Sequence, residues 1–202
     1  MESRDWDERY AEQPLMWSAE ANAWVQEVVA GLPPGRALDL AAGEGRNALW
    51  LVERGWQVHA SDFSSVAVGR MEELADERLG ERRSHLTTAV ADAVHDVQEQ
   101  AAYDLVVLSY LQLAGPDLRR ALANAVDALR PAGTLLLVGH AMRPLTAGTG
   151  GPQDPAVLYD PDDITGVLDE MPVAITVASE RERQVEGADR PALDTLVVAA
   201  RL

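Results

Sequence analysis

The chain of 202 residues contains no cysteine and no lysine, so all 17 of its basic residues are arginines. Without cysteine it cannot form a disulfide, a cysteine-ligated zinc or iron–sulfur site, or a thiol nucleophile. Without lysine it has no side-chain amine for Schiff-base chemistry, and it cannot supply the Tyr-x-x-x-Lys pair of lysine-dependent reductases. These absences exclude several common enzyme mechanisms before any motif is considered.

Long hydrophobic segments are missing too. Residues 1–13 are densely charged where a signal peptide would be apolar, and no apolar run approaches the ~20 residues of a membrane span. The 33 acidic residues give a net charge of −16, which disfavours general attraction to phosphate backbones and to anionic lipid. We therefore expect a cytoplasmic protein that acts on a small molecule, with no nucleic-acid or membrane partner; the oligomeric state stays open.

The length suits a single domain over residues 1–202, and a chain of this size buries a sufficient core without metal or disulfide. We expect a helical cap, a core of alternating strands and helices, a mobile loop rich in Gly and Pro, and a closing helix with a β-hairpin. These parts correspond to residues 1–34, 35–140, 141–163 and 164–202.

Short apolar runs alternate with helical stretches after the first thirty residues, and Gly or Pro marks the changes. This alternation predicts βα units around a mostly parallel, doubly wound α/β sheet. Strands are expected at 37–40, 57–60, 86–90, 105–108 and 134–139, followed by a hairpin of 174–185 and 193–200. Helices are expected at 5–11, 18–30, 47–54, 65–78, 117–129 and 163–170.

The first strand leads through Gly43 and Gly45 into a helix. Glycines at such a turn let the backbone approach a ligand at the carboxyl end of the sheet. Written as Gly43-x-Gly45-x-x-Ala48, with Asp62 at the distance expected for a ribose ligand, the turn matches the dinucleotide fingerprint. This interpretation would make the protein an NAD(P)-dependent oxidoreductase.

The same turn also fits a second pattern, Asp39-x-Ala41-x-Gly43-x-Gly45, an acid followed by small residues at alternate positions, which is typical of S-adenosylmethionine sites. A dinucleotide places its pyrophosphate on the helix N-terminus, where Asp39 and Glu44 bring two carboxylates. S-adenosylmethionine carries an ammonium and a sulfonium and no phosphate. The charges therefore favour S-adenosylmethionine, and the oxidoreductase stays open as the alternative.

Two further acids follow the next two strands. Asp62 ends the second strand, where its carboxylate can accept hydrogen bonds from both ribose hydroxyls, and Phe63 can lie against adenine. Asp92 follows the third strand and can accept from the adenine amino group while the Ala93 N–H donates to the ring. Three acids at the carboxyl ends of three successive strands predict one shared ligand.

At these residues the sequence resembles the class I S-adenosylmethionine-dependent methyltransferases, and within them the group related to tellurite-resistance and thiopurine methyltransferases. The family implies a Rossmann-like, seven-stranded sheet whose last strand is antiparallel and inserted beside strand five. The resemblance covers nearly the whole chain and rests on residues 6–10, 16–17, 39–47, 62, 92, 103–106 and 129–134.

Carried over by position, the family implies that Asp39 contacts the methionine part of the cofactor, Asp62 the ribose and Asp92 the adenine. One departure is Ala41, which stands where the family usually has the first glycine of the turn.

Methyl transfer from a sulfonium is an in-line displacement, so the enzyme mainly aligns the acceptor and excludes water. A hydroxyl acceptor additionally needs a general base, for which the best candidate is His140 after strand five. Ser109, Tyr110 and Gln112 follow strand four at the position facing the methyl group; we expect Tyr110 to be catalytic and Ser109 to contact the cofactor. The expected acceptor is a small S, Se/Te or O nucleophile.

The segment after strand four lacks the Asn-Pro-Pro-Tyr or Asp-Pro-Pro-Tyr signature of amino-methylating nucleic-acid enzymes, which argues against DNA or RNA. A second alternative is an S-adenosylmethionine-binding protein without catalysis, because it would share every cofactor-side residue.

Further side chains have expected roles around the cofactor and the substrate. Arg46 can pair with the cofactor carboxylate or with Glu44, and the pair with Glu44 is favoured. Trp17 is expected in an apolar lid over the sulfonium, where an aromatic face attracts a cation. Arg143 and Tyr159 bracket the Gly-rich loop and are expected to contact an anionic substrate. No metal site is predicted.

Overall fold

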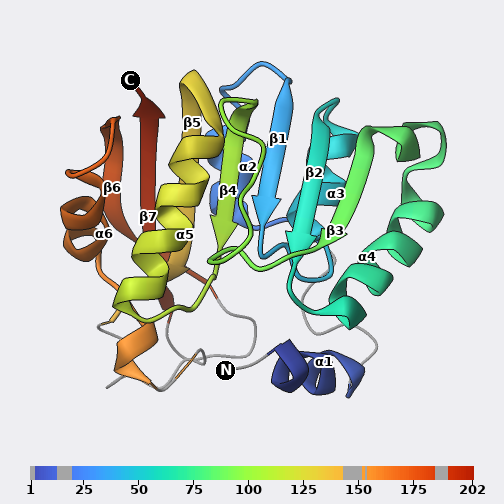
Figure 1. Cartoon of the computed structure of the whole chain (residues 1–202), viewed down its shortest axis with the longest axis horizontal. Helices are drawn as coiled ribbons and strands as arrows, with labels where there is room; N and C mark the ends of the chain where they lie inside the picture. The colour runs from blue at the N-terminus through green and yellow to red at the C-terminus, as the bar shows by residue number, and fades with distance from the viewer. Residues whose placement is uncertain (1–2, 13–19, 143–151, 153, 185–190) are drawn as a thin grey trace.

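A computed structural model describes residues 3–12, 20–142, 152, 154–184 and 191–202 of the chain. Its centre is one seven-stranded sheet with the strand order β3-β2-β1-β4-β5-β7-β6 (Figure 1). The strands are β1 Arg36–Leu40, β2 Gln57–Asp62, β3 Leu86–Val90, β4 Tyr103–Ser109, β5 Leu129–His140, β6 Val173–Arg183 and β7 Ala192–Arg201.

The first five strands pair in parallel, and β7 is antiparallel to both of its neighbours, β5 and β6. This confirms the predicted Rossmann-like sheet with a C-terminal hairpin, and also the inserted last strand that the resemblance implied. The insertion has one consequence for the site: in the β5–β7 register, Asp194 lies opposite His140 at the carboxyl end of β5.

The helices are α1 Ser3–Ala11, α2 Ala23–Val29, α3 Arg46–Glu53, α4 Ser65–Arg78, α5 Gly115–Ala128 and α6 Pro161–Leu168, with short 3-10 helices at Gly80–His85 and Pro155–Val157. The helix expected at 18–30 begins later, because the Asn22 side chain caps it by accepting from the N–H groups of Trp24 and Val25. None of these described helices is long and apolar enough to cross a membrane.

Alternate residues of each strand point to opposite faces of the sheet and form two cores. On one face Ala37 and Val107 pack with helices α2, α3 and α4; on the other, Leu38 and Val106 pack with α5 and α6. Because both faces of the central strands are covered, they are almost continuously apolar, as expected for a parallel sheet between two helical layers. Ligands are thereby confined to the strand ends.

Helix α1 lies below the carboxyl ends of the strands on the β2 and β3 side of the sheet, next to the start of α4 (Figure 1). The Asp7 carboxylate accepts hydrogen bonds from the Ser64 Oγ at 2.5 Å and from the Val66 N–H at 3.3 Å. An acid at this position also suits the positive end of the α4 dipole. This contact fixes α1 over the edge of the sheet where the predicted site residues lie.

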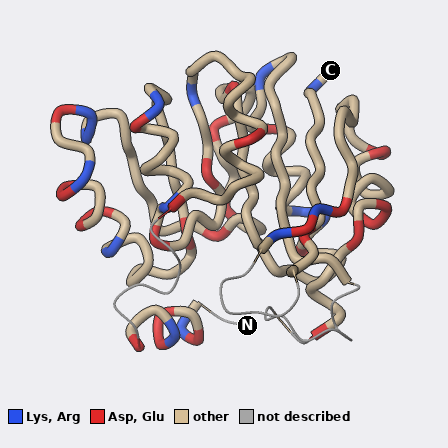
Figure 2. The backbone as a smooth tube through the Cα atoms, turned by 180° about the vertical axis from the view of Figure 1, so that it is seen from behind, with Lys and Arg blue, Asp and Glu red and all other residues tan. Residues whose placement is uncertain are grey.

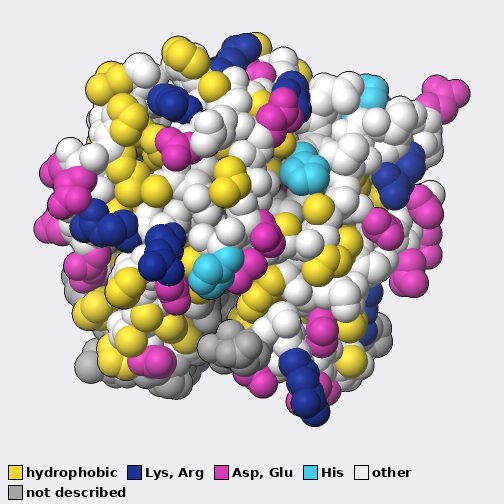
Figure 3. All heavy atoms as spheres, in the orientation of Figure 1, with side chains coloured by type: hydrophobic (Ala, Val, Ile, Leu, Met, Phe, Trp, Pro, Cys, Tyr) yellow, Lys and Arg dark blue, Asp and Glu magenta, His cyan; other side chains and the backbone are white. Residues whose placement is uncertain are grey.

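Arginine and acidic residues are interleaved along the backbone (Figure 2), and on the face that carries α5 they are mixed with hydrophobic side chains (Figure 3). Several arginines are paired with acids: Arg36 with Glu99 at 2.7 Å and Arg119 with Glu170 at 2.6 Å are two examples. Within the described residues, many of the arginines are therefore paired with acids and spread along the chain.

Candidate functional site

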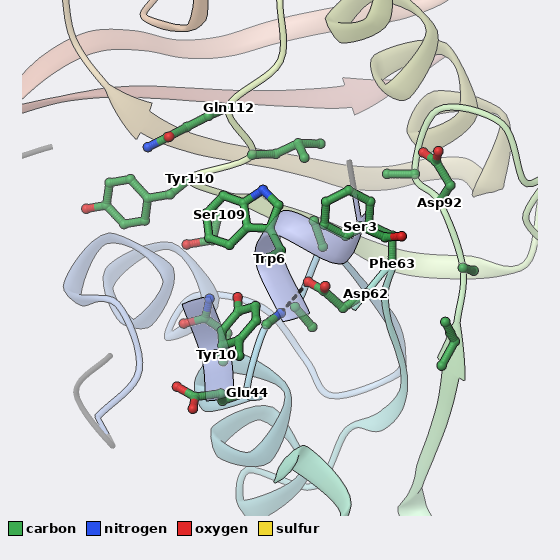
Figure 4. A pocket seen from close by; sticks show the side chains of 18 of the residues that line it. Ser3, Trp6, Tyr10, Glu44, Asp62, Phe63, Asp92, Ser109, Tyr110 and Gln112 are labelled. Carbon is green, nitrogen blue, oxygen red and sulfur yellow. Dashed lines mark hydrogen bonds between the residues drawn. The ribbon is translucent and has the colours of Figure 1, made fainter. Parts of the chain in front are cut away.

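A cavity of about 680 Å³ opens at the carboxyl ends of β1, β2, β3 and β4. Helix α1 supplies part of its wall, with Trp6 and Tyr10 facing the loops that follow the strands (Figure 4). In open α/β sheets, ligands bind at the point where the connections of two neighbouring central strands run in opposite directions. The neighbours β1 and β4 form that point here, so the cavity has the position of a ligand site.

The turn after β1 places three alternate residues in the left-handed region: φ is 56° at Ala41, 58° at Gly43 and 82° at Gly45. The Gly43 N–H donates to the Asp62 Oδ2 at 2.8 Å. A Cβ on Gly45 would overlap the Met71 side chain. The turn therefore needs glycine for its backbone and its close packing, and the positive φ of Ala41 explains why a glycine usually stands there.

Asp39 lies beneath this turn and is fully buried, and it does not line the cavity. Neither of its carboxylate oxygens has a hydrogen-bond partner of good geometry within the described residues, although the Ala48 N–H is near enough to lower its pKa. Burial raises the pKa of Asp39 to about 7, and the positive charge of Arg46 offsets part of the rise. The site thus holds one buried carboxyl group whose hydrogen-bonding capacity is largely unused.

Asp62 ends β2 and lines the cavity, as predicted for a ribose ligand. Its Oδ1 accepts from the Ser64 N–H at 2.9 Å and its Oδ2 from the Gly43 N–H at 2.8 Å. Burial raises the pKa of Asp62, and these two hydrogen bonds oppose the rise. Asp62 therefore ties the start of α4 to the glycine turn, and each oxygen keeps a lone pair for a ligand.

Phe63, Asp92 and Ala93 line the end of the cavity expected to hold adenine (Figure 4). Asp92 accepts from the Val94 N–H at 2.8 Å and pairs with the His95 Nδ1 at 2.9 Å. Partial burial raises the pKa of Asp92, but the contacts with His95 and Val94 outweigh this and lower it overall. A turn aspartate thus holds the loop after β3, beside the expected position of the ligand.

Arg46 begins α3 and lines the cavity, with its guanidinium 5.7 Å from the centre of the Tyr110 ring. Glu44 takes Arg70 as its ion-pair partner at 3.0 Å, so the pair with Arg46 that the sequence favoured is replaced by one from α4. The reason is that Arg46 lies on the Tyr110 side of the turn whereas Arg70 approaches Glu44 from α4. Arg46 is thereby left facing the cavity.

Ser109 and Tyr110 line the opposite end of the cavity from Phe63 and Asp92 (Figure 4). The Ser109 Oγ is buried and makes no hydrogen bond within the described residues. Tyr110 has φ 58°, and its hydroxyl donates to the Asp194 Oδ2 at 2.9 Å and accepts from the Asn22 Nδ2 at 3.1 Å. The tyrosine is thus held in a strained conformation by contacts from α2 and β7.

His140 lies behind this tyrosine, outside the cavity lining, with the two ring centres 4.6 Å apart. Its Nδ1 is 3.8 Å from the Asp194 Oδ1. Burial lowers the pKa of His140, although the negative charge of Asp194 opposes this, so the imidazole is neutral at pH 7 and can accept a proton. The structure therefore brings both predicted catalytic residues, Tyr110 and His140, to one end of the site.

Asp194 and the rings of α1 were missed by the sequence analysis. Asp194 interrupts an apolar strand, and a lone acid in such a run was the available signal. Trp6 and Tyr10 are 5.8 Å apart between ring centres, and their recurrence four residues apart on a charged helix marks one apolar face. No local pattern linked either feature to the cavity.

The described residues include only part of the predicted lid. Trp17 and Arg143 lie outside the described residues. Tyr159 was expected to contact substrate, but only 3% of it is exposed, and its hydroxyl donates to the Leu111 carbonyl oxygen at 3.4 Å. Its ring packs directly against Gly139, so it is a core residue and that expectation was wrong.

In the described part of the chain, no group of three or more acidic, histidine or cysteine side chains is placed to hold a metal ion.

Residues 37–133 match a family model described as a methyltransferase domain. Among curated proteins, the chain is 32% identical over 130 residues to a demethylmenaquinone methyltransferase of Thermobifida fusca, across 64% of this chain and 50% of that protein. It is 34% identical over 131 residues to a probable non-canonical nonribosomal peptide synthetase of Salinispora arenicola, across 62% of this chain and 2% of that protein. The chain thus spans half or less of these curated relatives.

Solved structures share the fold over nearly the whole chain. A structure described for the conversion of a disulfide bond into a thioacetal group during echinomycin biosynthesis has a TM-score of 0.77 and 23% identity, with 98% of this chain and 92% of that one covered. A glycopeptide N-methyltransferase complexed with S-adenosyl-L-methionine has a TM-score of 0.71 and 19% identity, with 92% and 88% covered. The chain thus matches a methyltransferase-domain model over residues 37–133 and shares the fold of these solved structures over nearly its whole length.

Proposed function

We propose that the protein transfers a methyl group from S-adenosylmethionine to a small-molecule nucleophile. The observation that carries this proposal is the meeting, at one cavity, of the glycine turn after β1 with acids from the ends of β2 and β3, while the buried Asp39 of β1 lies beneath the turn. When bound, the cofactor supplies a methyl group already activated by its sulfonium. The remaining work of the protein is to bind, to align and to exclude water.

The residues present fit this cofactor. The buried carboxyl group of Asp39, which has no hydrogen-bond partner of good geometry among the described residues, suits the cationic methionine end. Arg46, which faces the cavity, suits the cofactor carboxylate, and the free lone pairs of Asp62 suit the ribose hydroxyls. Phe63 and Asp92 are placed to contact the adenine at the far end.

The acceptor binds at the Tyr110 end in this proposal, where Ser109 and the Tyr110 ring line the cavity and His140, behind that ring, supplies a neutral imidazole. A sulfur, selenium, tellurium or oxygen nucleophile fits, because the first three need positioning alone and a hydroxyl additionally needs a base. The sulfur chemistry described for the echinomycin structure and the resemblance to tellurite-resistance and thiopurine methyltransferases support this class of acceptor.

An NAD(P)-dependent oxidoreductase is less well supported, since Glu44 is buried at the start of α3, where a pyrophosphate would bind. A protein that binds the cofactor without catalysis would share the cofactor end, and methyl transfer to any acceptor in a panel of thiols, tellurite, selenite and small phenols would exclude it.

The test is isothermal titration of the wild-type protein and of Asp62→Ala with S-adenosylmethionine and S-adenosylhomocysteine. We expect both ligands to bind and the substitution to weaken binding by ~1–3 kcal/mol, because paired hydrogen bonds to the ribose are lost. Asp76→Ala is the matched control, since Asp76 is an exposed partner of Arg83 on α4 and should leave the affinity unchanged. Absence of binding to both ligands would overturn the proposal, and binding of reduced nicotinamide cofactor in their place would favour the oxidoreductase.

A further inference from the structure

Asp194 is a fully buried acid near the start of the hairpin strand β7. Three donors from three different elements converge on its Oδ2: the Arg183 Nε at 2.7 Å, the Tyr110 hydroxyl at 2.9 Å and the Trp24 Nε1 at 3.0 Å. The carboxylate therefore joins β6, α2 and the loop after β4 at the acceptor end of the cavity.

The fold alone gives no reason for a charge at this position. Residues 196–199 further along β7 are apolar and buried, and a buried ion pair is commonly no more stabilising than an apolar replacement of similar volume. A buried charge at the edge of a ligand cavity is therefore a candidate for a role in the site.

Tyr110 is the residue that Asp194 controls most directly. Its backbone N–H donates to the Val138 carbonyl oxygen at 2.7 Å, and its hydroxyl is held between Asp194 and Asn22. These contacts hold φ at 58°, a left-handed conformation that is unfavourable for a residue with a side chain. Asp194 thereby fixes the tyrosine ring that forms the acceptor wall.

His140 is the second residue within the influence of Asp194. The charged groups that face its ring are Asp194 from β7, Arg183 from β6 and Arg46 from α3, and the Tyr110 ring packs against it. The two arginines and burial lower the pKa of His140, whereas Asp194 raises it. Asp194 is thus the group among these that favours proton uptake by the imidazole.

We propose that Asp194 is a positioning residue that orients Tyr110 and His140 so that the acceptor end takes a proton from a protic nucleophile, a thiol or a hydroxyl compound. This inference rests on the proposed methyl transfer. In the step, the acceptor's electron pair forms the bond to the methyl carbon while its S–H or O–H proton passes through a bridging water to His140, which lies behind Tyr110 and outside the cavity lining. The carbon–sulfonium bond breaks at the same time, and His140 later releases the proton to solvent.

The first test needs no acceptor. The four histidines are titrated by NMR in the wild type, in Asp194→Asn and in Arg183→Gln, and His140→Gln assigns the signal. We expect the pKa of His140 to fall further in Asp194→Asn and to rise in Arg183→Gln, because the two substitutions remove opposite charges. Asp104→Asn is the matched control at the other end of β4, where Asp104 accepts from the Arg36 N–H.

The second test measures methyl transfer to an alkyl thiol with a pKa near that of cysteine, about 8.5, and to an aryl thiol that is already ionised at neutral pH. In Asp194→Asn we expect kcat to fall at least about tenfold with the alkyl thiol and less than about threefold with the aryl thiol. A small phenol, which needs deprotonation, should follow the alkyl thiol. S-adenosylmethionine affinity should stay unchanged.

Equal losses with both thiols, or a His140 pKa that moves in neither variant, would overturn the role of Asp194. If the wild type binds S-adenosylmethionine but methylates none of the three probes, the protic acceptor class is wrong. If it binds no S-adenosylmethionine, the proposed function itself fails, whereas the NMR titration still decides whether Asp194 controls His140. Arg183→Gln keeps the test decisive if Asp194→Asn does not fold, because Arg183 is partly exposed on the last strand of the sheet.

Discussion

Two aspartates of this protein are equally buried but differ in the hydrogen bonds that their carboxylates accept. Asp39 and Asp194 are both 0% exposed, one beneath the glycine turn and one at the acceptor end. Asp39 makes no hydrogen bond of good geometry within the described residues, and burial raises its pKa to about 7. Asp194 accepts from Tyr110, Trp24 and Arg183.

The difference divides the site into two parts. At Asp39 a ligand would supply the missing partner of the carboxylate, whereas at Asp194 side chains of the protein already supply the partners. An unpartnered buried carboxyl group costs stability, and the natural compensation is a cationic ligand. A saturated carboxylate instead holds its neighbours in fixed positions. The cofactor end is therefore open to a binding partner, and the acceptor end is a preassembled wall.

The largest expected effect comes from the same Asp→Asn substitution at the two positions. The pKa of Asp39 is higher in the folded chain than in the unfolded one, so the wild type loses stability as pH rises from about 4 to 7. The full ionisation of Asp39 corresponds to roughly 4 kcal/mol. Asp39→Asn should therefore be more stable than the wild type at pH 8 and similar to it at pH 4, measured by urea unfolding.

Asp194→Asn should have the opposite sign, with a loss of about 2–3 kcal/mol at pH 8, because Arg183 and Tyr110 lose a charged partner. Asp39→Asn should also bind S-adenosylmethionine more weakly, since the carboxylate meant for the ligand is gone. Changes of the same sign in both variants would remove the distinction between the two ends.

The next effect tests whether the cofactor end depends on close backbone packing. Gly45→Ala should lower stability by about 2–3 kcal/mol, because the residue has φ 82° and its new methyl group would overlap Met71. For a chain of this size that corresponds to a fall in Tm of roughly 5–10 °C, which calorimetry would measure.

Gly69→Ala is the control within the same region. Gly69 lies inside α4, and a Cβ there would meet nothing within 4 Å. Alanine favours a helix over glycine by about 1 kcal/mol, so this variant should be slightly more stable than the wild type. If Gly45→Ala behaved like Gly69→Ala, the tight turn would have no structural importance.

The cofactor end was predictable because its pattern is local. The strand at Leu86–Val90 and the helix at Ser65–Arg78 have the bounds expected from periodicity and capping, and the sheet has the expected order of parallel strands and hairpin. Asp62 and Asp92 follow their strands directly in sequence, so the common edge of a parallel sheet brings them together.

The acceptor end was not predictable in the same way because its contacts join distant positions. Trp24 donates to Asp194 across 170 residues, and Asn22 to Tyr110 across 88. Hydrophobic periodicity identified the strand that carries Asp194 but contains no information about which side chains lie beside it. Likewise, the replacement of Arg46 by Arg70 as partner of Glu44 depends on how α4 packs, which spacing along the chain does not specify.

The smallest expected effect compares two alanines that share a left-handed backbone. Ala41 in the glycine turn has φ 56°, and Ala132 before Gly133, outside the cavity lining, has φ 64°. Glycine relieves the clash of the Cβ in this conformation but makes the unfolded chain more flexible, so each Ala→Gly change should raise stability by only about 0.5–1 kcal/mol. Only Ala41→Gly should also tighten S-adenosylmethionine binding, by up to about threefold, because only its methyl group stands between the backbone and the cavity. Equal affinity changes in the two variants, measured by isothermal titration, would mean that the methyl group of Ala41 does not restrict the approach of the ligand.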